Sequence, residues 1–179
     1  PEFLREISCG SAIAGAEVEH PRFRAAARDT VGHCLDRPAA RIGDRLHIVL
    51  VKADVDIRLT DWPQGGKVHR GFKEALEEVW PDLLPYIRKL HDKGCKIWIT
   101  GHSLGGALAT LFASRFNSTQ GVYTFGSPRV GNEVFNKNFE AKIYRIVNND
   151  DIVPRVPPPG KYVHVGKLKF IDSDGIIRD

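Results

Sequence analysis

Apolar positions along the second half of the chain form short runs that alternate with longer helical patterns. The runs typical of buried strands cover residues 46–51, 95–100, 121–125 and 142–147. Apolar residues recur at helical spacing over 72–91, and small and apolar residues over 104–116 predict a second, buried helix. Because strands that alternate with helices form parallel βαβ units, we expect an α/β fold with a mostly parallel central sheet flanked by helices.

Several less regular segments complete the pattern. Pro81 and Pro85 interrupt the helical pattern over 72–91, so we expect that helix to be kinked or split into two segments. The other expected elements are a helix over 21–35, a short helix over 130–139, a proline-rich loop over 154–160, a short strand over 162–165 and a hairpin over 170–177. This sequence of elements is consistent with a single domain over residues 1–179.

Composition excludes several classes of function. The chain has 179 residues, of which 42% are hydrophobic and 27% charged, as is ordinary for a globular protein. No apolar run approaches the roughly 20 residues of a membrane span, so we expect no transmembrane segment. The net charge of +4 is scattered, and nucleic-acid binding is not expected. The three cysteines form neither a disulfide framework nor a metal motif, so we expect no metal site.

The clearest chemical motif is Gly101–His102–Ser103–Leu104–Gly105, at the turn from the strand over 95–100 to the helix over 104–116. A Gly-x-Ser-x-Gly motif in this setting is the nucleophile elbow of α/β-hydrolases, where a sharp turn exposes the serine hydroxyl. Glycines have no Cβ, so they allow the tight turn. Ser103 is therefore the predicted nucleophile, and the backbone N–H of Leu104 is the predicted oxyanion-hole donor.

A serine hydroxyl needs a base, usually a histidine oriented by a carboxylate. In this fold the order along the chain is Ser, then Asp or Glu, then His. Asp150 and Asp151 follow the strand over 142–147, where a carboxylate can reach a histidine above the sheet. Because Asn and Asp also favour turns, position alone leaves the two aspartates equal as candidates.

Four segments together resemble the class 3 lipases, the fungal type of α/β-hydrolase. They are Gly66–Phe72, Thr100–Ala107, Tyr123–Asn132 and Arg145–Pro154. The resemblance is strong over about residues 65–166, whereas residues 1–45 match the family poorly. It implies that Asp151, which directly precedes Ile-Val-Pro, is the catalytic acid.

The resemblance also implies an activity. Similar lipases hydrolyse ester bonds of acylglycerols and related lipids through an acyl-enzyme, without a metal or other cofactor. We therefore expect a lipid or small ester substrate, transient contact with a lipid interface and, more weakly, secretion. In the family, the histidines that match His69 and His102 are not the general base.

Two departures from the family pattern bear on the mechanism. Of the seven histidines only His164 follows Asp151, in a Tyr-x-His-x-Gly stretch whose histidine is not the base in similar lipases. Either His164 has taken over as general base, or the base lies outside this chain. The Arg-Gly-Thr or Arg-Gly-Ser that supplies a second oxyanion donor in similar lipases is also missing after the strand over 46–51, where Lys52 or Ala53 could supply it.

These departures lead to two further expectations. The family segment that carries the second donor and part of the lid is missing, which favours small or partly soluble esters over emulsified triglyceride. The two departures are also consistent with a second function, in which a truncated or divergent scaffold of the same fold binds acyl ligands with little or no turnover.

Overall fold

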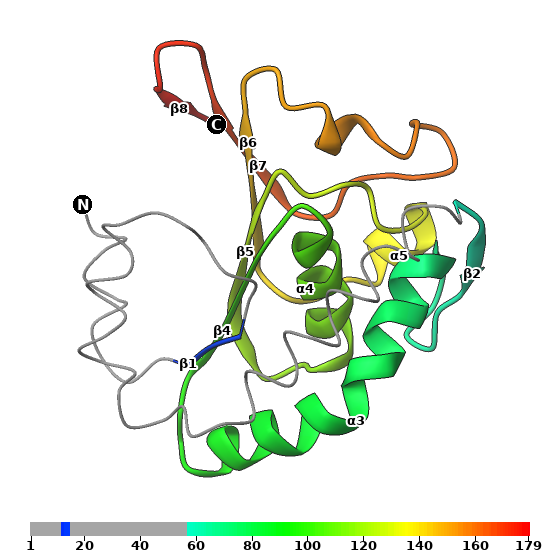
Figure 1. The fold of residues 1–179 in the computed structure, drawn as a ribbon, viewed down its shortest axis with the longest axis vertical. Coiled ribbons are helices and arrows are strands. Elements are labelled where there is room, and N and C mark those ends of the chain that lie inside the picture. The colour runs from blue at the N-terminus through cyan, green and yellow to red at the C-terminus, as the bar shows by residue number, and fades with distance from the viewer. Residues whose placement is uncertain (1–11, 15–56) are drawn as a thin grey trace.

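The computed structural model describes residues 12–14 and 57–179. The helix expected over 21–35 and the strand expected over 46–51 lie outside these residues, as do Lys52 and Ala53. The fold is therefore analysed from the elements of the described ranges (Figure 1).

A six-stranded sheet organises the described part of the chain (Figure 1). Its order is β1 (Ala12–Ala14), β4 (Ile97–His102), β5 (Thr119–Phe125), β6 (Ile143–Asn148), β7 (Lys167–Ile171) and β8 (Ile177–Arg178). Neighbours from β1 to β7 are parallel, and β7–β8 is an antiparallel pair. The mostly parallel sheet predicted from the sequence is thus confirmed, and the carboxyl ends of β4, β5, β6 and β7 meet at one edge.

Helix α4 (Leu104–Arg115) covers one face of the sheet (Figure 1). Helix α3 (Arg70–Asp92) lies on the same face and packs on the side of α4 that is turned away from the strands. This position between two layers explains the composition of α4, which is apolar around its whole circumference. Short residues such as Gly106 and Ala107 let α4 approach its neighbours closely. A separate two-stranded sheet of β2 (Leu59–Asp61) and β3 (Lys67–His69) leads into α3.

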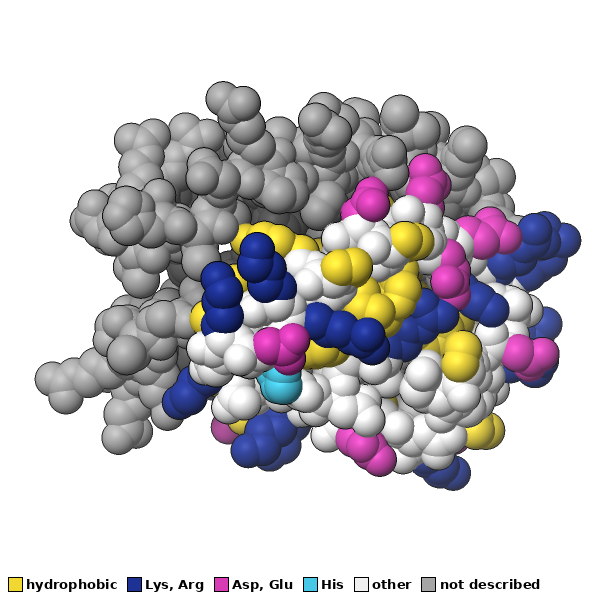
Figure 2. All heavy atoms as spheres, turned by 90° about the horizontal axis from the view of Figure 1, so that it is seen from below, with side chains coloured by type: hydrophobic (Ala, Val, Ile, Leu, Met, Phe, Trp, Pro, Cys, Tyr) yellow, Lys and Arg dark blue, Asp and Glu magenta, His cyan; other side chains and the backbone are white. Residues whose placement is uncertain are grey.

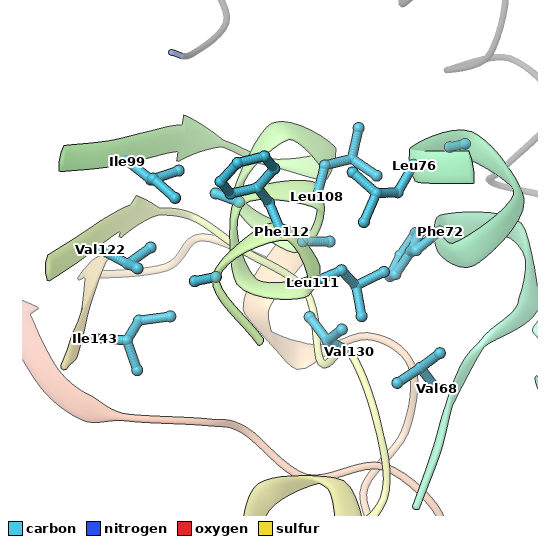
Figure 3. Close-up of a cluster of buried hydrophobic side chains, with 14 of the residues drawn as sticks. Val68, Phe72, Leu76, Ile99, Leu108, Leu111, Phe112, Val122, Val130 and Ile143 are labelled. Atoms are coloured by element: carbon cyan, nitrogen blue, oxygen red, sulfur yellow. The ribbon is translucent and has the colours of Figure 1, made fainter. Parts of the chain in front are cut away.

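The hydrophobic core lies where these three layers meet. Figure 3 shows Ile99, Val122 and Ile143 from adjacent strands facing the apolar side chains of α4. On the far side of α4, Leu76 and Phe72 of α3 close the cluster (Figure 3). Alternation along β4 matches this arrangement, because Ile97 and Ile99 are buried whereas Trp98 and Thr100, on the opposite face, are only partly buried.

Helix α3 runs through both of its prolines as one helix, with Pro81 and Pro85 inside it. Figure 1 shows that its axis changes direction along its length. Since proline removes a backbone hydrogen bond and clashes with the preceding turn, a bend is the expected response. The sequence pattern therefore located the helix correctly, and the bend takes the place of a break into two segments.

The segments after β5 differ in detail from the sequence predictions. The expected helix over 130–139 is the shorter α5 (Glu133–Lys137), which the Asn132 side chain caps by accepting from the Phe135 N–H. The prediction of a strand over 162–165 is wrong, because Tyr162 and Val163 form only isolated bridges. The hairpin expected over 170–177 is confirmed as β7 and β8. In the turn that joins them, the Asp172 carboxylate accepts hydrogen bonds from the N–H groups of Asp174 and Ile176 and from the Arg178 side chain.

Surface charge is mixed on the face shown in Figure 2, where acidic and basic side chains alternate with apolar groups. Within the ranges that the structure describes, no helix is long and apolar enough to cross a membrane.

The core predicts a large effect of cavity formation in α4. Leu111 is fully buried, so Leu111→Ala should lower the free energy of unfolding by about 2–5 kcal/mol. The control Leu168→Ala changes a leucine of β7 that is 43% exposed, and should cost about 0.5 kcal/mol or less. Urea unfolding measures both values. Equal losses in the two variants would contradict the position of Leu111 in the core.

Candidate active site

The turn between β4 and α4 has the strained geometry of a nucleophile elbow. Ser103 has φ 53° and ψ −125°, in the left-handed half of backbone space that residues other than glycine rarely adopt. Its N–H donates to the Phe125 carbonyl at 2.9 Å, which ties the elbow to the end of β5. A Cβ on Gly101 would lie 2.2 Å from the Gly105 carbonyl oxygen, so the turn requires glycine there. The motif therefore folds as the sequence predicts.

The elbow also places the predicted oxyanion donor, the Leu104 N–H, at the start of α4. Leu104 is the first residue of α4, and the N–H of a first helical residue has no acceptor within its own helix. The positive end of the helix dipole adds to the attraction for a negatively charged oxygen. Leu104 is thus placed where the sequence predicts a donor for an oxyanion next to Ser103.

A cavity of about 490 Å³ opens at the carboxyl ends of the central strands. Its wall combines polar groups with apolar ones from β5, β6 and β7, among them Phe125, Ile146 and Ile171. His102 of the elbow and Asp151 of the loop after β6 both line it. The topology therefore brings His102, the residue beside the candidate nucleophile, and Asp151, the candidate acid, to one site, as expected for an open parallel sheet.

Asp151 lies against the backbone of Gly126, the residue directly after β5. A Cβ on Gly126 would lie 2.4 Å from the Asp151 Oδ2 and 3.7 Å from the His102 Nε2. Gly126 has φ +56°, and its N–H donates to the Ile146 carbonyl at 2.9 Å. Glycine at this position therefore allows the Asp151 carboxylate to approach the backbone closely, whereas the imidazole would lie at ordinary van der Waals distance from a Cβ.

The structure separates the two aspartates that position along the chain left equal. The half-buried Asp151 accepts a hydrogen bond from the Val153 N–H through Oδ1 at 3.0 Å, which starts the 3₁₀ turn η2 (Val153–Arg155). The side chain of Asp150 is 92% exposed and lies 3.9 Å from Arg155. Both line the cavity, but only the Asp151 carboxylate is held by the backbone, as an orienting carboxylate needs to be.

His164 does not occupy a position typical of a triad histidine. Its Nε2 lies 2.8 Å from the Pro154 carbonyl oxygen, which can only accept, so Nε2 carries the hydrogen. A triad histidine needs the opposite tautomer, with Nδ1–H donating to the carboxylate and Nε2 free to take the serine proton. Within residues 57–179, the His164 ring forms no hydrogen bond with Ser103 or Asp151.

The electrostatic surroundings of His164 also disfavour a role as base. Burial, together with the positive charge of Arg145 and the smaller effect of Arg129, lowers its pKa to about 4. The hydrogen bond to Pro154 acts in the opposite direction but is outweighed. A general base acts best with a pKa near the working pH, whereas His164 is neutral and hard to protonate at pH 7.

Two features of the site carry no clear signal in the sequence. The first is the position of His102 beside Asp151, which follows from the outward direction of its side chain at the end of β4. The second is a pair of arginines, Arg129 and Arg145, whose charges act on His164. Arg145 is largely buried and its Nε has no hydrogen-bond partner; burial, with the charge of Arg129, lowers its pKa to about 10. Neither could be found from spacing, since the residues come from different segments.

Comparison with known proteins places this geometry among lipases. Residues 47–161 match the profile of the family described as lipase (class 3). The secreted mono- and diacylglycerol lipase 1 of Fusarium solani is 37% identical over 153 residues, which cover 74% of this chain and 46% of that protein. A lipase of Rhizopus niveus is 33% identical over 136 residues, covering 67% of this chain and 35% of the relative. The chain thus spans less than half the length of these two curated relatives.

Solved structures agree with the sequence matches. Lipase II from Rhizopus niveus superposes with a TM-score of 0.63 at 32% identity, covering 69% of this chain and 53% of that one. Another, described as a triacylglycerol lipase whose catalytic centre is formed by a serine protease triad, has a TM-score of 0.63 at 32% identity. That match covers 70% of this chain and 53% of the other.

The surroundings of His164 predict a dependence of stability on pH. Its folded pKa is about 4 against an ordinary value of 6.5, so between these values the unfolded chain binds a proton that the folded chain does not. Stability from this group is therefore present above pH 6.5 and lost as the pH falls toward 4. His164→Gln should flatten the fall in thermal midpoint between pH 6.5 and 4.5.

The control for this prediction is His91→Gln, which changes an exposed histidine in the last turn of α3. Parallel curves for the unmodified chain and His164→Gln would contradict the buried, neutral state of His164.

Proposed function

The chain belongs to the class 3 lipase family, and from this premise we propose that it is a serine hydrolase that cleaves carboxylic ester bonds of lipids. Its fold is that of the α/β-hydrolases. The observation that carries the proposal is the strained elbow at Ser103, whose neighbour His102 lines the same cavity as Asp151.

In the proposed reaction the Ser103 Oγ attacks the ester carbonyl carbon, and its proton passes to an imidazole base. The Leu104 N–H stabilises the oxyanion of the tetrahedral intermediate. When the intermediate collapses, the alcohol leaves with the proton and the acyl group stays on Ser103. Water then attacks the acyl-enzyme with help from the same base and releases the acid.

Asp151 is proposed to orient the imidazole base and to stabilise its protonated form. Its Oδ1 is held by the Val153 N–H, and its Oδ2 lies beside Gly126 in the cavity that His102 also lines. The order of residues along the chain makes His164 a candidate for the base, with a base outside this chain as the alternative. Its hydrogen bond to Pro154 and its lowered pKa favour another role, so the present proposal assigns the nucleophile, the acid and one oxyanion donor.

The substrate class follows from the apolar side of the cavity and from the relatives. Phe125, Ile146 and Ile171 line the cavity next to Asp151 and suit an acyl chain. Ile152, which is 69% exposed, and Val156 lie in the loop that follows Asp151. An exposed apolar rim of this kind suits transient contact with a lipid surface. The named relatives act on mono- and diacylglycerols or triacylglycerols, and we extend lipid esters of that class to this chain.

One observation favours a second candidate function, the binding of acyl ligands with little turnover. In the described part of the chain, no imidazole is hydrogen-bonded to the Ser103 hydroxyl, and the two residues considered for the second oxyanion donor lie outside that part. Reaction with a fluorophosphonate distinguishes the two functions, because covalent labelling of Ser103 requires an activated hydroxyl. Labelling supports the hydrolase, and its absence supports the binding protein.

Substitutions at the proposed nucleophile and acid should abolish hydrolysis of p-nitrophenyl butyrate. Ser103→Ala and Asp151→Asn should each lower kcat by about 10⁴-fold or more, because the triad acts as a unit. The matched control is Asp150→Asn, which changes the exposed neighbouring carboxylate and should stay within about threefold of the unmodified chain. Loss of turnover in Asp150→Asn with retention in Asp151→Asn would overturn the assignment of the acid.

Gly126→Ala should lower kcat by about 10²-fold, because the new Cβ would displace the Asp151 carboxylate by close contact. Gly94→Ala is the matched control, since Gly94 also has a positive φ but has open space around its Cβ direction. Both variants carry the cost of a positive φ, so their stabilities should fall by similar amounts near 1 kcal/mol. Equal kcat values for the two variants, measured with the same ester, would refute the close approach of Asp151.

A further inference from the structure

The loop that follows Asp151 is held from outside by two side chains. His164 donates from Nε2 to the Pro154 carbonyl, and Arg129 donates from Nη1 to the carbonyls of Arg155 and Pro157. The accepting carbonyls thus belong to residues that follow the proposed acid closely. Neither donor belongs to the loop, because Arg129 follows β5 and His164 precedes β7.

Arg129 is built to hold two carbonyls at once. Its Nη1 lies 2.8 Å from the Pro157 oxygen, and its own backbone N–H donates to the Val156 carbonyl at 2.9 Å. A guanidinium presents its donors in a rigid plane, so one side chain can fix several acceptors in a set geometry. In the structure it therefore links the turn after β5 to the turn after β6.

His164 completes this arrangement on the other side of the 3₁₀ turn. Pro154 is buried, and its carbonyl accepts a hydrogen bond from the imidazole Nε2 at 2.8 Å. One residue earlier, the Val153 N–H donates to the Asp151 Oδ1. The chain of contacts therefore runs from His164 through Pro154 and Val153 to the proposed catalytic carboxylate.

We propose that Arg129 and His164 are positioning residues, which hold the loop over residues 153–157 so that the Asp151 carboxylate keeps its place beside Gly126. This inference rests on the proposed role of Asp151 as the acid. It gives His164 a function that differs from that of a general base, since the ring acts as a hydrogen-bond donor and exchanges no proton with Ser103.

The test compares variants of the whole chain that remove a donor with variants that retain one. His164→Leu and Arg129→Ala remove the donors, whereas His164→Gln keeps an N–H and Arg129→Lys keeps the charge. Arg88→Ala, on an exposed position of α3, is the control. Each variant is assayed for kcat and KM on p-nitrophenyl butyrate and for hydrogen exchange of the Val153 amide by NMR.

The proposal expects His164→Leu and Arg129→Ala to lower kcat about tenfold or more, with KM within about twofold, and to speed Val153 exchange at least tenfold. His164→Gln should keep most of the kcat and most of the protection of the Val153 amide from exchange, whereas a general base could not be replaced by glutamine. If His164→Leu or Arg129→Ala fails to fold, His164→Gln and Arg129→Lys carry the comparison, and Arg129→Lys, which keeps the charge but not the guanidinium plane, should lower kcat and speed Val153 exchange relative to Arg88→Ala, by less than about tenfold.

Three results would overturn the proposal: unchanged Val153 exchange in the variants without donors, faster exchange with unchanged kcat in an active chain, or a loss of kcat in His164→Gln as complete as in His164→Leu. Failure of the proposed function is recognised separately. If the unmodified chain does not turn over the ester or label with a fluorophosphonate, the hydrolase assignment fails, and the exchange of Val153 alone decides whether the two residues hold the loop.

Discussion

The close approach of the Asp151 carboxylate to the backbone of Gly126 is the contact on which the rest of the site depends. It requires that β5 and β6 are adjacent and parallel, so that both end at one edge of the sheet. The Gly126 N–H continues this pairing by donating to Ile146, and the Ser103 N–H donates to the residue before Gly126. The elbow, the proposed acid Asp151 and the cavity are therefore fixed by the same three strand ends, and a shift in strand register would separate them.

This arrangement carries local costs that the layers of the fold must offset. Ser103 adopts a backbone conformation that costs of order 1–3 kcal/mol, and the Nε atom of Arg145 is buried without a hydrogen-bond partner. The burial of α4 between the sheet and α3 offsets these costs. It removes apolar surface from water, which is the dominant favourable contribution to folding. The strained Ser103 directly precedes α4, the most buried helix of the described residues, so distortion there would also displace the core.

The sequence predicted those features that depend on local pattern. Apolar alternation located β4, β5 and β6 to within two residues, and the Gly-x-Ser-x-Gly motif located Ser103, because glycines must flank so tight a turn. The sequence could not choose between Asp150 and Asp151 by position, since the difference lies in a hydrogen bond and in exposure. It also could not show that Arg129 and His164 meet the loop after β6. Tertiary contacts between separate segments leave no periodic signal in a single chain.

The same limit explains why the sequence alone suggests a catalytic role for His164. A histidine after the acid satisfies the order Ser, Asp, His, but its chemistry is set by the atom that its Nε2 faces, and here that atom is a carbonyl oxygen. Burial, together with the positive charges of Arg145 and Arg129, lowers the pKa of the ring to about 4, so the ring is neutral at pH 7. Arg145, with a pKa of about 10, remains charged there. Donors that do not titrate near pH 7 hold a loop with constant geometry, whereas a general base must change its protonation state there in every cycle. The surroundings that make His164 a poor base are therefore those that suit it to holding Pro154 in place.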